Sequence, residues 1–324
     1  MAVRPLIIDC DTGEDDALAL LLAAREHLPL RTVVSSFGNA SIERTTRNTA
    51  DVLGYGGMTG VPVLQGSARP LQPHLHQDPD IDAVEFVGEN GLCNMVLTRS
   101  AQVKILRPRQ RFADRLLEVL AAGDPVDYVI TGPCTNLARA LIHDHAAVQR
   151  SVARIFVMGG AVSCPGNTGP TNPKTAAPWA EFNFYCDPYA ADVVLSAGIP
   201  VYLVSWDTTS RMTISYERFR RLRARDATGE FTIRLMTCFF RSFGLSLGRS
   251  FELNDPITVL AAMGEGAYTE RRIRVITDGL QFGRTVPDPG GASVLLMDLS
   301  AKEREVLLER ALGALGIHAP KVLG

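Results

Sequence analysis

The fold of this chain is decided by one stretch near its start, Pro5-Leu-Ile-Ile-Asp-Cys-Asp-Thr-Gly-Glu-Asp-Asp-Ala-Leu-Ala-Leu20. Residues 6–8 form a short apolar run of the strand type, and this run stops at Asp9. After the turn residues 12–13, the apolar run 17–24 suits a helix. In an open α/β sheet, a turn of this kind lies at the carboxyl end of a strand, where ligands bind. The stretch therefore predicts a strand, a turn and a helix with a ligand site at the turn.

Five acidic side chains crowd this one turn: Asp9, Asp11, Glu14, Asp15 and Asp16. Asp15 and Asp16 could simply cap the helix and complement its dipole, as carboxylates do at a helix N-terminus. Capping does not account for Asp9 and Asp11, which lie at the strand end and would repel the others. Packing like charges together is unfavourable unless a cation neutralises them, and hard divalent cations take oxygen ligands. The cluster therefore predicts a metal site.

Composition narrows the class of protein. Hydrophobic residues make up 46% of the 324 residues, enough for a sizeable core in one large α/β domain or two smaller ones. A net charge of −2 argues against nucleic acid or an anionic membrane as the main partner, and no apolar run approaches transmembrane length. Six cysteines without CxxC spacing are typical of reduced thiols in a cytosolic protein. Because the first residues enter a strand without a signal peptide, we expect a cytoplasmic protein.

Strand-like and helical segments alternate along the rest of the chain, which is typical of a mostly parallel sheet flanked by helices. We expect strands at 31–36, 61–64, 127–130, 154–158, 201–205, 274–276 and 293–297, and helices at 41–55, 112–122, 137–142, 188–197 and 301–315. Residues 211–249 are helix-rich, with the basic run 218–225 as a solvated face, and 66–91 form a long loop of functional type. The fold class is α/β, with an open, mostly parallel, Rossmann-like sheet. Because no linker or repeat interrupts the pattern, residues 1–324 are predicted to form a single domain.

Two known patterns resemble the opening stretch. The haloacid-dehalogenase-like phosphatases place Asp-x-Asp-x-Thr/Val after a first strand, but Gly13 occupies the Thr/Val position here. The inosine-uridine nucleoside hydrolase family has the signature Asp-x-Asp-Pro-Gly-x-Asp-Asp, which the chain matches except for Thr12 in place of proline. Further motifs of that family follow in its order: Gly38-Asn39, Thr131-Gly-Pro-Cys-Thr-Asn-Leu137, Met158-Gly-Gly160 with Pro165-Gly-Asn167, Ala180-Glu-Phe-Asn183 with Asp187-Pro188, and Asn254-Asp255-Pro256.

The resemblance implies the nucleoside hydrolase fold and Ca²⁺-dependent hydrolysis of ribonucleosides to free base and ribose, in salvage, by a homodimer or homotetramer. It implies that Ca²⁺ is held by Asp11, Asp16, the Thr131 carbonyl and Asp255. Asp11 would also be the general base for a metal-bound water. Asp9 would orient this group from outside the coordination sphere, and Asp15 would accept a hydrogen bond from a ribose hydroxyl.

The remaining ribose contacts implied by the resemblance are Asn39, Asn167, Glu181 and Asn183, with Met158 and Phe182 as apolar walls. Asn39 could instead be only a turn residue. The polar residues of Glu181-Phe182-Asn183 flank an aromatic at an expected strand end. Asp187 and Pro188 are explained most simply as the cap and first turn of a helix.

The chain departs from the family at two positions where many members have a histidine, one of which is thought to protonate the leaving base. Asn254 replaces the histidine that many members place before the late aspartate, and Val87 replaces a second histidine. An amide does not titrate near neutral pH, so Asn254 cannot act as a general acid, although it could hydrogen-bond the base. His74 and His76 lie in the long loop and could reach the pocket or stay on the surface.

An insertion before the Ala-Glu-Phe-Asn motif makes Asn172 a rival of Asn167 for the ribose contact. Trp179 could stack on the base or only form a wall, and Trp206 is expected in the core. The preferred base stays open. Two other functions also stay open: a catalytically silent ribose-binding protein, and a metal-dependent phosphatase with Asp9 as nucleophile.

Overall fold

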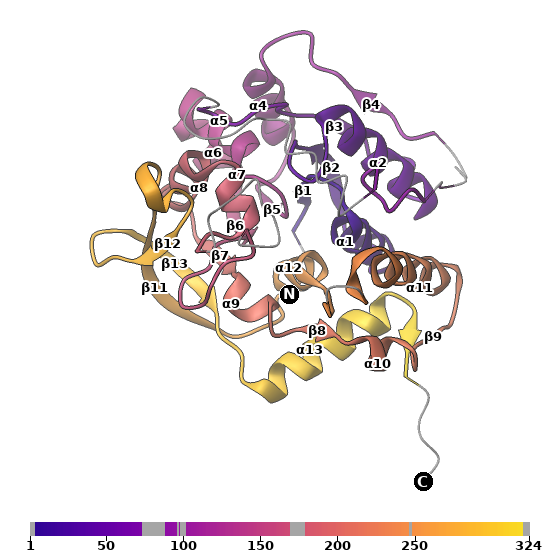
Figure 1. Cartoon of the computed structure of the whole chain (residues 1–324). Helices are drawn as coiled ribbons and strands as arrows, with labels where there is room; N and C mark the ends of the chain where they lie inside the picture. Colours follow the sequence, from indigo (N-terminus) through magenta and orange to yellow (C-terminus); the bar gives the residue numbers. More distant parts are fainter. Residues whose placement is uncertain are drawn as a thin grey trace.

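A ten-stranded sheet forms the centre of the molecule (Figure 1). The computed structural model describes residues 4–72, 88–95, 97, 102–168, 179–245 and 248–319. Neighbouring strands pair in parallel from β4 to β13 in this spatial order: β4 Ile105–Leu106, β3 Val63–Gln65, β2 Leu30–Ser35, β1 Leu6–Cys10, β5 Val126–Ile130, β6 Val152–Met158, β7 Val201–Val204 and β13 Ala292–Met297. Two antiparallel strands, β11 Tyr268–Val275 and β12 Thr285–Pro287, complete the edge beyond β13. The predicted mostly parallel α/β sheet is confirmed.

The sheet changes its direction of growth at β1. From β1 the chain adds β2, β3 and β4 on one side, and it then returns to place β5, β6 and β7 on the other. Such a switch point opens a crevice at the carboxyl ends of the two strands beside it. Because Asp9 pairs with Ile130 across β1 and β5, the residues that follow, Asp11 and Thr131, emerge at the same place.

β1 is buried on both faces, as expected for a central parallel strand. Ile7 joins one hydrophobic cluster, while Leu6, Ile8 and Cys10 join the cluster on the opposite face. This alternation follows from the two-residue period of a strand. The strand therefore anchors the turn at its carboxyl end between two packed helical layers.

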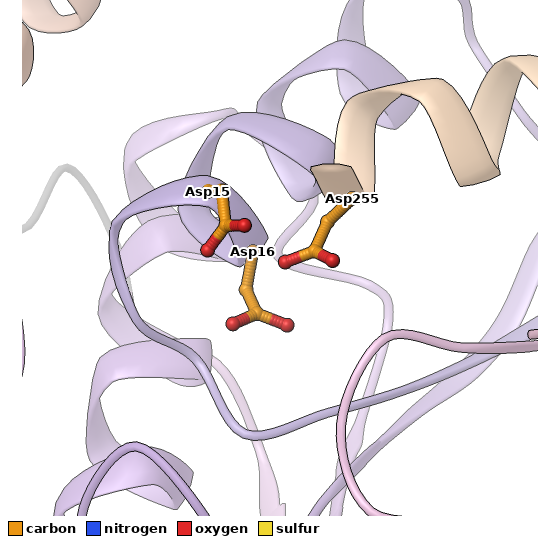
Figure 2. Close-up of side chains that lie close together, drawn as sticks. All are labelled: Asp15, Asp16 and Asp255. Carbon is orange, nitrogen blue, oxygen red and sulfur yellow. The ribbon is translucent and has the colours of Figure 1, made fainter. Parts of the chain in front are cut away.

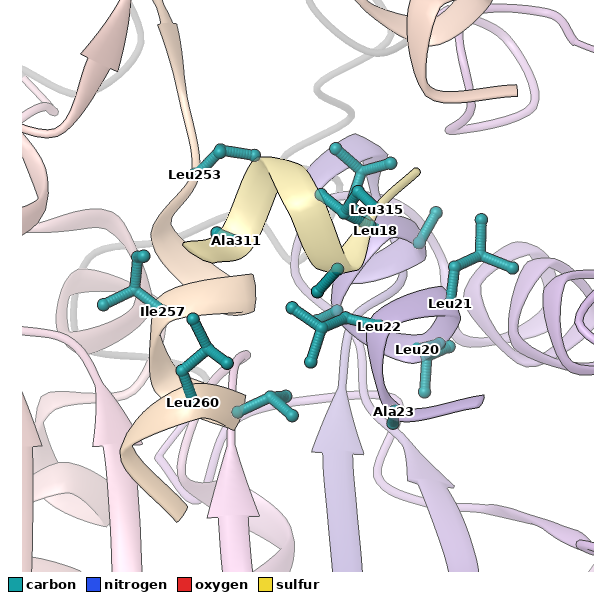
Figure 3. Close-up of a cluster of buried hydrophobic side chains, with 14 of the residues drawn as sticks. Leu18, Leu20, Leu21, Leu22, Ala23, Leu253, Ile257, Leu260, Ala311 and Leu315 are labelled. Atoms are coloured by element: carbon teal, nitrogen blue, oxygen red, sulfur yellow. The ribbon is translucent and has the colours of Figure 1, made fainter. Parts of the chain in front are cut away.

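One layer consists of helices that pack by leucine-rich faces. Figure 3 shows Leu18 and Leu22 on one helix, Ile257 and Leu260 on another and Ala311 on a third, all of them members of one buried cluster. Burying one such leucine or isoleucine side chain contributes about 1.5–3 kcal/mol. The layer comprises α1 Glu14–Arg25, α2 Ile42–Tyr55, α11 Ala227–Phe239, α12 Asn254–Ala262 and α13 Ala301–Ala314. This packing holds the first turn of α1 beside the first turn of α12, although more than two hundred residues separate them in sequence.

The second layer covers the other face of the sheet, so that α5, α6 and α8 lie across the sheet from α1, α2 and α11 (Figure 1). It comprises α4 Phe112–Ala121, α5 Thr135–His143, α6 His145–Ser151 and α8 Pro188–Leu195. Asp187 caps α8 by accepting a hydrogen bond from the Ala190 N–H at 3.1 Å, with Pro188 in the first turn. The predicted cap and first-turn proline are therefore confirmed.

The smaller elements lie outside these layers. Two pairs of short strands join antiparallel, and several short helical turns link the larger elements. They are β8 Thr213–Ile214 with β10 Phe251–Glu252, β9 Arg223–Ala224 with β14 Ile317–His318, α7 Phe182–Cys186, α9 Trp206–Thr209, α10 Tyr216–Phe219, η1 Phe240–Gly244 and η2 Gly279–Gln281.

One local prediction is wrong and two are confirmed. The expected strand end at residues 181–183 is instead the start of α7, because the Glu181 carboxylate accepts the Asn183 and Phe184 N–H groups and so caps a helix. The basic run 218–225 is solvated as expected, since Arg218 is partly exposed and the other four arginines are exposed. The run spans α10, a turn and β9. Trp206 is buried as expected, but it begins the short helix α9.

Candidate active site

Three carboxylates converge where α1 and α12 begin. Asp15 and Asp16 come from the first turn of α1, and Asp255 comes from the first turn of α12 (Figure 2). One oxygen of each lies within 4.8 Å of one oxygen of each of the others. The sequence predicted an acidic cluster at the strand-to-helix turn, and packing of the two helices adds Asp255 to it.

Asp11 lies at the end of β1 with one oxygen bound and the other without a partner. Its Oδ2 accepts the Asn39 N–H at 2.7 Å, while its buried Oδ1 has no hydrogen-bond partner among the described residues. Burial, reinforced by the charge of Asp16, raises the pKa of Asp11 well above its usual range. A buried acceptor of this kind is unfavourable unless a ligand uses it.

The Asp11 carboxylate occupies space that is open because Gly38 and Gly132 have no side chains. A Cβ on Gly38 would lie 2.0 Å from Asp11 Oδ2, and a Cβ on Gly132 would lie 2.9 Å from Asp11 Oδ1. Gly38 also has a φ of +150°, which side chains of L-residues rarely adopt. The close approach of the backbone at residues 38 and 132 therefore fixes where the carboxylate points.

Substituting Gly38→Ala is expected to displace the Asp11 carboxylate and to reduce ribose release at least about tenfold, with about 1–3 kcal/mol of destabilisation from the strained backbone. Gly57→Ala is the matched control, because Gly57 also has a positive φ of +77° but a methyl group added there would have no atom within 4 Å. Kinetics and thermal unfolding of both variants separate the two effects. Full activity of Gly38→Ala would show that the close approach to Asp11 is unimportant.

Asp16 is held from three directions. Its Oδ1 accepts the Thr131 hydroxyl at 2.7 Å, and its Oδ2 accepts the Gly13 N–H at 2.9 Å and the Asn39 amide at 3.3 Å. Burial and the neighbouring charge of Asp15 raise the pKa of Asp16 to about 7. Asn39 therefore does more than form a turn, since it binds both Asp11 and Asp16.

Asp255 has the least support from donors. No described N–H or O–H group donates a hydrogen bond to it, and its own carboxyl group donates one to the neighbouring Asp15. Burial, followed by the charges of Asp15, Asp16 and Asp11, raises its pKa well above the usual range. Four neighbouring carboxylates with one unpartnered oxygen make an all-oxygen donor set, which fits a hard divalent cation.

The Thr131 carbonyl, the fourth ligand implied by the resemblance, already accepts one hydrogen bond in this structure. The Asn183 side-chain amide donates to it at 2.8 Å, and the same amide lies 3.2 Å from the Met158 carbonyl. A carbonyl oxygen has two lone pairs, so one stays available for a cation. The geometry brings Asn183, Met158 and Thr131 together at one wall of the crevice.

Asp9 is set apart from this cluster. It is 0% exposed, and its two oxygens accept the Tyr128 hydroxyl at 2.9 Å and the Asn136 amide at 2.8 Å. Burial raises its pKa to about 7, while both hydrogen bonds oppose that rise. A carboxylate so enclosed is not accessible as a nucleophile, which argues against the phosphatase alternative.

Tyr128 and Asn136 were assigned no role from sequence. Asn136 belongs to the 131–137 motif, so its signal was available, and its amide also donates to the Ser35 carbonyl at 3.1 Å. Tyr128 is one aromatic within a buried strand and carries no local signal that separates it from the core.

The Glu181 carboxylate is occupied by backbone groups. It accepts the N–H groups of Gly160, Asn183 and Phe184 at 2.9, 2.8 and 3.1 Å. Burial raises its pKa to about 7, against the effect of these hydrogen bonds. The structure shows Glu181 as the cap that fixes the start of α7, and its predicted ribose contact stays a prediction.

Asn167 and Trp179 lie beside the same helix α7. Asn167 Oδ1 accepts the Phe182 N–H at 2.8 Å, so this asparagine ties its loop to α7. Trp179 packs against Ala180 and Tyr185, as a wall residue does. Four residues considered from the sequence lie outside the described residues: His74, His76, Val87 and Asn172.

Asn254 lies beside the acidic cluster. Its Nδ2 donates to Asp15 Oδ2 at 3.1 Å, and its Oδ1 is buried without a partner among the described residues. The Asn254 amide therefore donates to Asp15, and its Oδ1 is the atom that could accept a hydrogen bond from a ligand.

The family model for the inosine-uridine preferring nucleoside hydrolases matches residues 6–310, nearly the whole chain. The chain belongs to this family. It is a ribonucleoside hydrolase, in a family of metal-dependent enzymes.

Relatives with named specificities support this assignment. The pyrimidine-specific ribonucleoside hydrolase RihA of Enterobacter sp. (strain 638) is 35% identical over 296 residues, 88% of each chain. RihA of Escherichia coli O9:H4 (strain HS) is 34% identical over 293 residues, again 88% of each chain.

Solved structures show the same fold at lower identity. A plant nucleoside hydrolase, PpNRh1, superposes with a TM-score of 0.84 at 24% identity, covering 97% of this chain and 99% of that one. A purine-preferring ribonucleoside hydrolase from Gardnerella vaginalis gives 0.80 at 23% identity with the same coverage. Among the described helices of this hydrolase, none combines the length and apolar character that a membrane crossing requires.

Proposed function

We propose that this hydrolase cleaves the N-glycosidic bond of pyrimidine ribonucleosides with Ca²⁺ as its cation, held by Asp11, Asp16, the Thr131 carbonyl and Asp255. The observation that carries the proposal is the carboxylate cluster at the switch point of the sheet, with one Asp11 oxygen left without a partner among the described residues. Hard oxygen donors in a crevice of this kind suit Ca²⁺ better than a softer metal.

Asp11 is proposed as the general base. Its Oδ2 is fixed by the Asn39 N–H, so Oδ1 is the oxygen that can take a proton from the attacking water. The chemistry that Ca²⁺ supplies when bound is positive charge, which lowers the pKa of water and attracts ribose hydroxyls. Asp9 holds the β1 end in place through Tyr128 and Asn136.

The ribose is proposed to bind between the acidic cluster and the α7 wall. Asp15 accepts a ribose hydroxyl, and Asn39, Asn167, Glu181 and Asn183 line the sugar site, with Met158 and Phe182 as apolar walls. Glycoside cleavage passes through an oxocarbenium-like state with positive charge on the sugar. Carboxylates near that charge stabilise the transition state more than the neutral ground state, which raises the rate.

The preference for pyrimidines rests on the relatives named pyrimidine-specific, which are the more similar in sequence. The solved structure named purine-preferring is below 25% identical and supports the fold alone. All six cysteines are free, which agrees with a cytoplasmic enzyme of nucleoside salvage. The homodimer or homotetramer expected from the resemblance stays a prediction.

A reducing-sugar assay on uridine, cytidine, inosine, adenosine and guanosine tests the proposal, with added Ca²⁺ and with chelator. Uridine or cytidine should release ribose fastest, and chelation should slow release by at least about 100-fold because the water loses its activation. Release undiminished by chelation would contradict the metal role. Ca²⁺-dependent binding without release of ribose would instead indicate the silent ribose-binding protein.

A further inference from the structure

An open pocket of about 640 Å³ lies where the segment after β3 meets the start of α4 and the end of α5. Figure 1 shows α4 and α5 at the edge of the molecule away from α10 and α13. Sites for small molecules typically measure about 300–1,000 Å³, so the pocket is large enough for one. Three arginines line it, one from each of these segments: Arg69, Arg111 and Arg139. We call it the arginine pocket.

Arg139 is fixed in place with part of its guanidinium unused. Its Nε donates to Ser67 Oγ at 3.0 Å, and its Nη2 donates to the carbonyls of Arg69 and Pro70, both at 3.2 Å. Among the described residues, its Nη1 has no hydrogen-bond partner. Asp187 lies within electrostatic range of Arg139, but that carboxylate is buried and accepts three hydrogen bonds from other groups. Arg139 therefore offers a positioned positive charge with free N–H groups.

Arg111 also keeps its charge, although a histidine and a carboxylate lie beside it. Arg111 Nη1 lies 3.3 Å from His143 Nδ1, and His143 Nε2 lies 2.6 Å from Asp114 Oδ1. A guanidinium can only donate, so Nδ1 accepts and the ring proton is on Nε2, which donates to Asp114. The Asp114 carboxylate is thus paired with His143 and not with an arginine of the pocket.

The arginine pocket combines this positive charge with apolar surface. Within the described part of the chain, no carboxylate forms an ion pair with any of its three arginines. Ile142 lines it with 59% of its surface exposed, beside the half-buried Phe112. Guanidinium groups bind phosphate oxygens through paired, charge-assisted hydrogen bonds, and apolar side chains favour the face of a flat ring. The pocket therefore fits a phosphate monoester that carries a ring.

Ser67 separates the arginine pocket from the active site. Its N–H donates to Asn136 Oδ1 at 2.8 Å, and the Asn136 amide donates in turn to Asp9 at 2.8 Å. None of the residues that line the pocket belongs to the carboxylate cluster at the starts of α1 and α12. A ligand in the pocket would therefore leave the ribose site open and would need no cation at that cluster.

We propose that the arginine pocket is a second binding site, which takes a nucleoside 5′-monophosphate. The three arginines bind the phosphate, and the base lies against Phe112 and Ile142. The inference does not depend on the proposed function, because it uses neither the cation nor the catalytic residues.

Calorimetric titration with pseudouridine 5′-monophosphate tests this assignment. Its ribose and base are joined by a carbon–carbon bond, so hydrolysis of N-glycosidic bonds leaves the probe intact. We expect one saturable site per chain, with the same affinity for Ca²⁺-loaded and metal-free protein. Arg111→Gln and Arg69→Gln should each weaken binding at least about tenfold at unchanged Tm, because charge-assisted hydrogen bonds to the phosphate are lost. Ribose 5-phosphate and inorganic phosphate should bind more weakly than the nucleotide, because they lack the base.

The matched control is Arg221→Gln, which removes an exposed arginine in the turn between α10 and β9 and should leave binding unchanged. Absence of saturable binding to the wild type would overturn the proposal. Binding that both pocket variants leave undiminished would do so as well, since the nucleotide would then lie elsewhere. Binding that requires Ca²⁺ would place the nucleotide at the acidic cluster and not in the arginine pocket. Equal affinities for the nucleotide and inorganic phosphate would exclude the contact with the base.

Discussion

Asp11→Asn is expected to remove ribose release from every nucleoside, lowering kcat by about 10³-fold, because an amide cannot take the proton of the attacking water. The change should leave the fold intact. The asparagine carbonyl can still accept the Asn39 N–H, which now binds Asp11 Oδ2, and its NH₂ group would occupy the place of the unpartnered Oδ1. Initial rates with saturating uridine and Ca²⁺ measure the loss.

Asp187→Asn is the control for removing a buried carboxylate at the same edge of the sheet. Asp187 accepts the Thr135 hydroxyl at 2.7 Å and the Leu71 N–H at 2.8 Å, and it caps α8. Loss of the Asp187 carboxylate should lower the free energy of unfolding by about 1 kcal/mol, as for a lost helix cap. It should leave kcat largely unchanged. If Asp11→Asn kept wild-type kcat, Asp11 would not be the base.

The first strand and the first helix could be predicted because one short stretch contains both an apolar run of strand length and a second apolar run that suits a helix. Residues 6–8 form a continuous apolar run within the buried strand β1, and the helical run that follows begins at the acidic turn. The alternation of strands and helices then fixes a parallel sheet, since parallel neighbours require crossover helices. These signals are local, so a single sequence carries them.

The start of α7 could not be predicted in the same way. Glu181, Phe182 and Asn183 alternate polar and apolar residues as a strand does, and no local signal overrides that pattern. The cap depends partly on Gly160, twenty-one residues earlier, whose N–H donates to the same carboxylate. A contact between distant segments decided the local structure here.

The acidic site also combines a part that local sequence predicts with a part that depends on distant contacts. The cluster after β1 could be recognised from charge alone, but the place of Asp255 within it came only from the family resemblance. Its proximity to Asp15 results from leucine packing between α1 and α12.

Asp255→Asn is expected to separate cation binding from folding. In the wild type, Ca²⁺ at about 100 times its Kd should stabilise the fold by about 2.7 kcal/mol, a rise in Tm of about 5 °C. The variant removes one of three carboxylates that lie within 4.8 Å of one another. It should therefore lose the Ca²⁺-dependent rise while its metal-free Tm stays equal to or above that of the wild type, since a repulsive charge is gone.

Thermal unfolding with Ca²⁺ and with chelator, together with calorimetric titration of Ca²⁺, measures both effects. Asp192→Asn on α8 is the control, because it removes a partly buried carboxylate outside the cluster. It should keep the Ca²⁺-dependent rise in Tm. A lower metal-free Tm for Asp255→Asn would mean that its carboxylate stabilises the fold without a cation, and an unchanged Ca²⁺ affinity would exclude it as a ligand. A loss of Ca²⁺ binding together with an undiminished metal-free Tm is expected only if the Asp255 carboxylate repels its neighbours when no cation is bound. The same negative charge then opposes folding without the cation and attracts the cation when it is present.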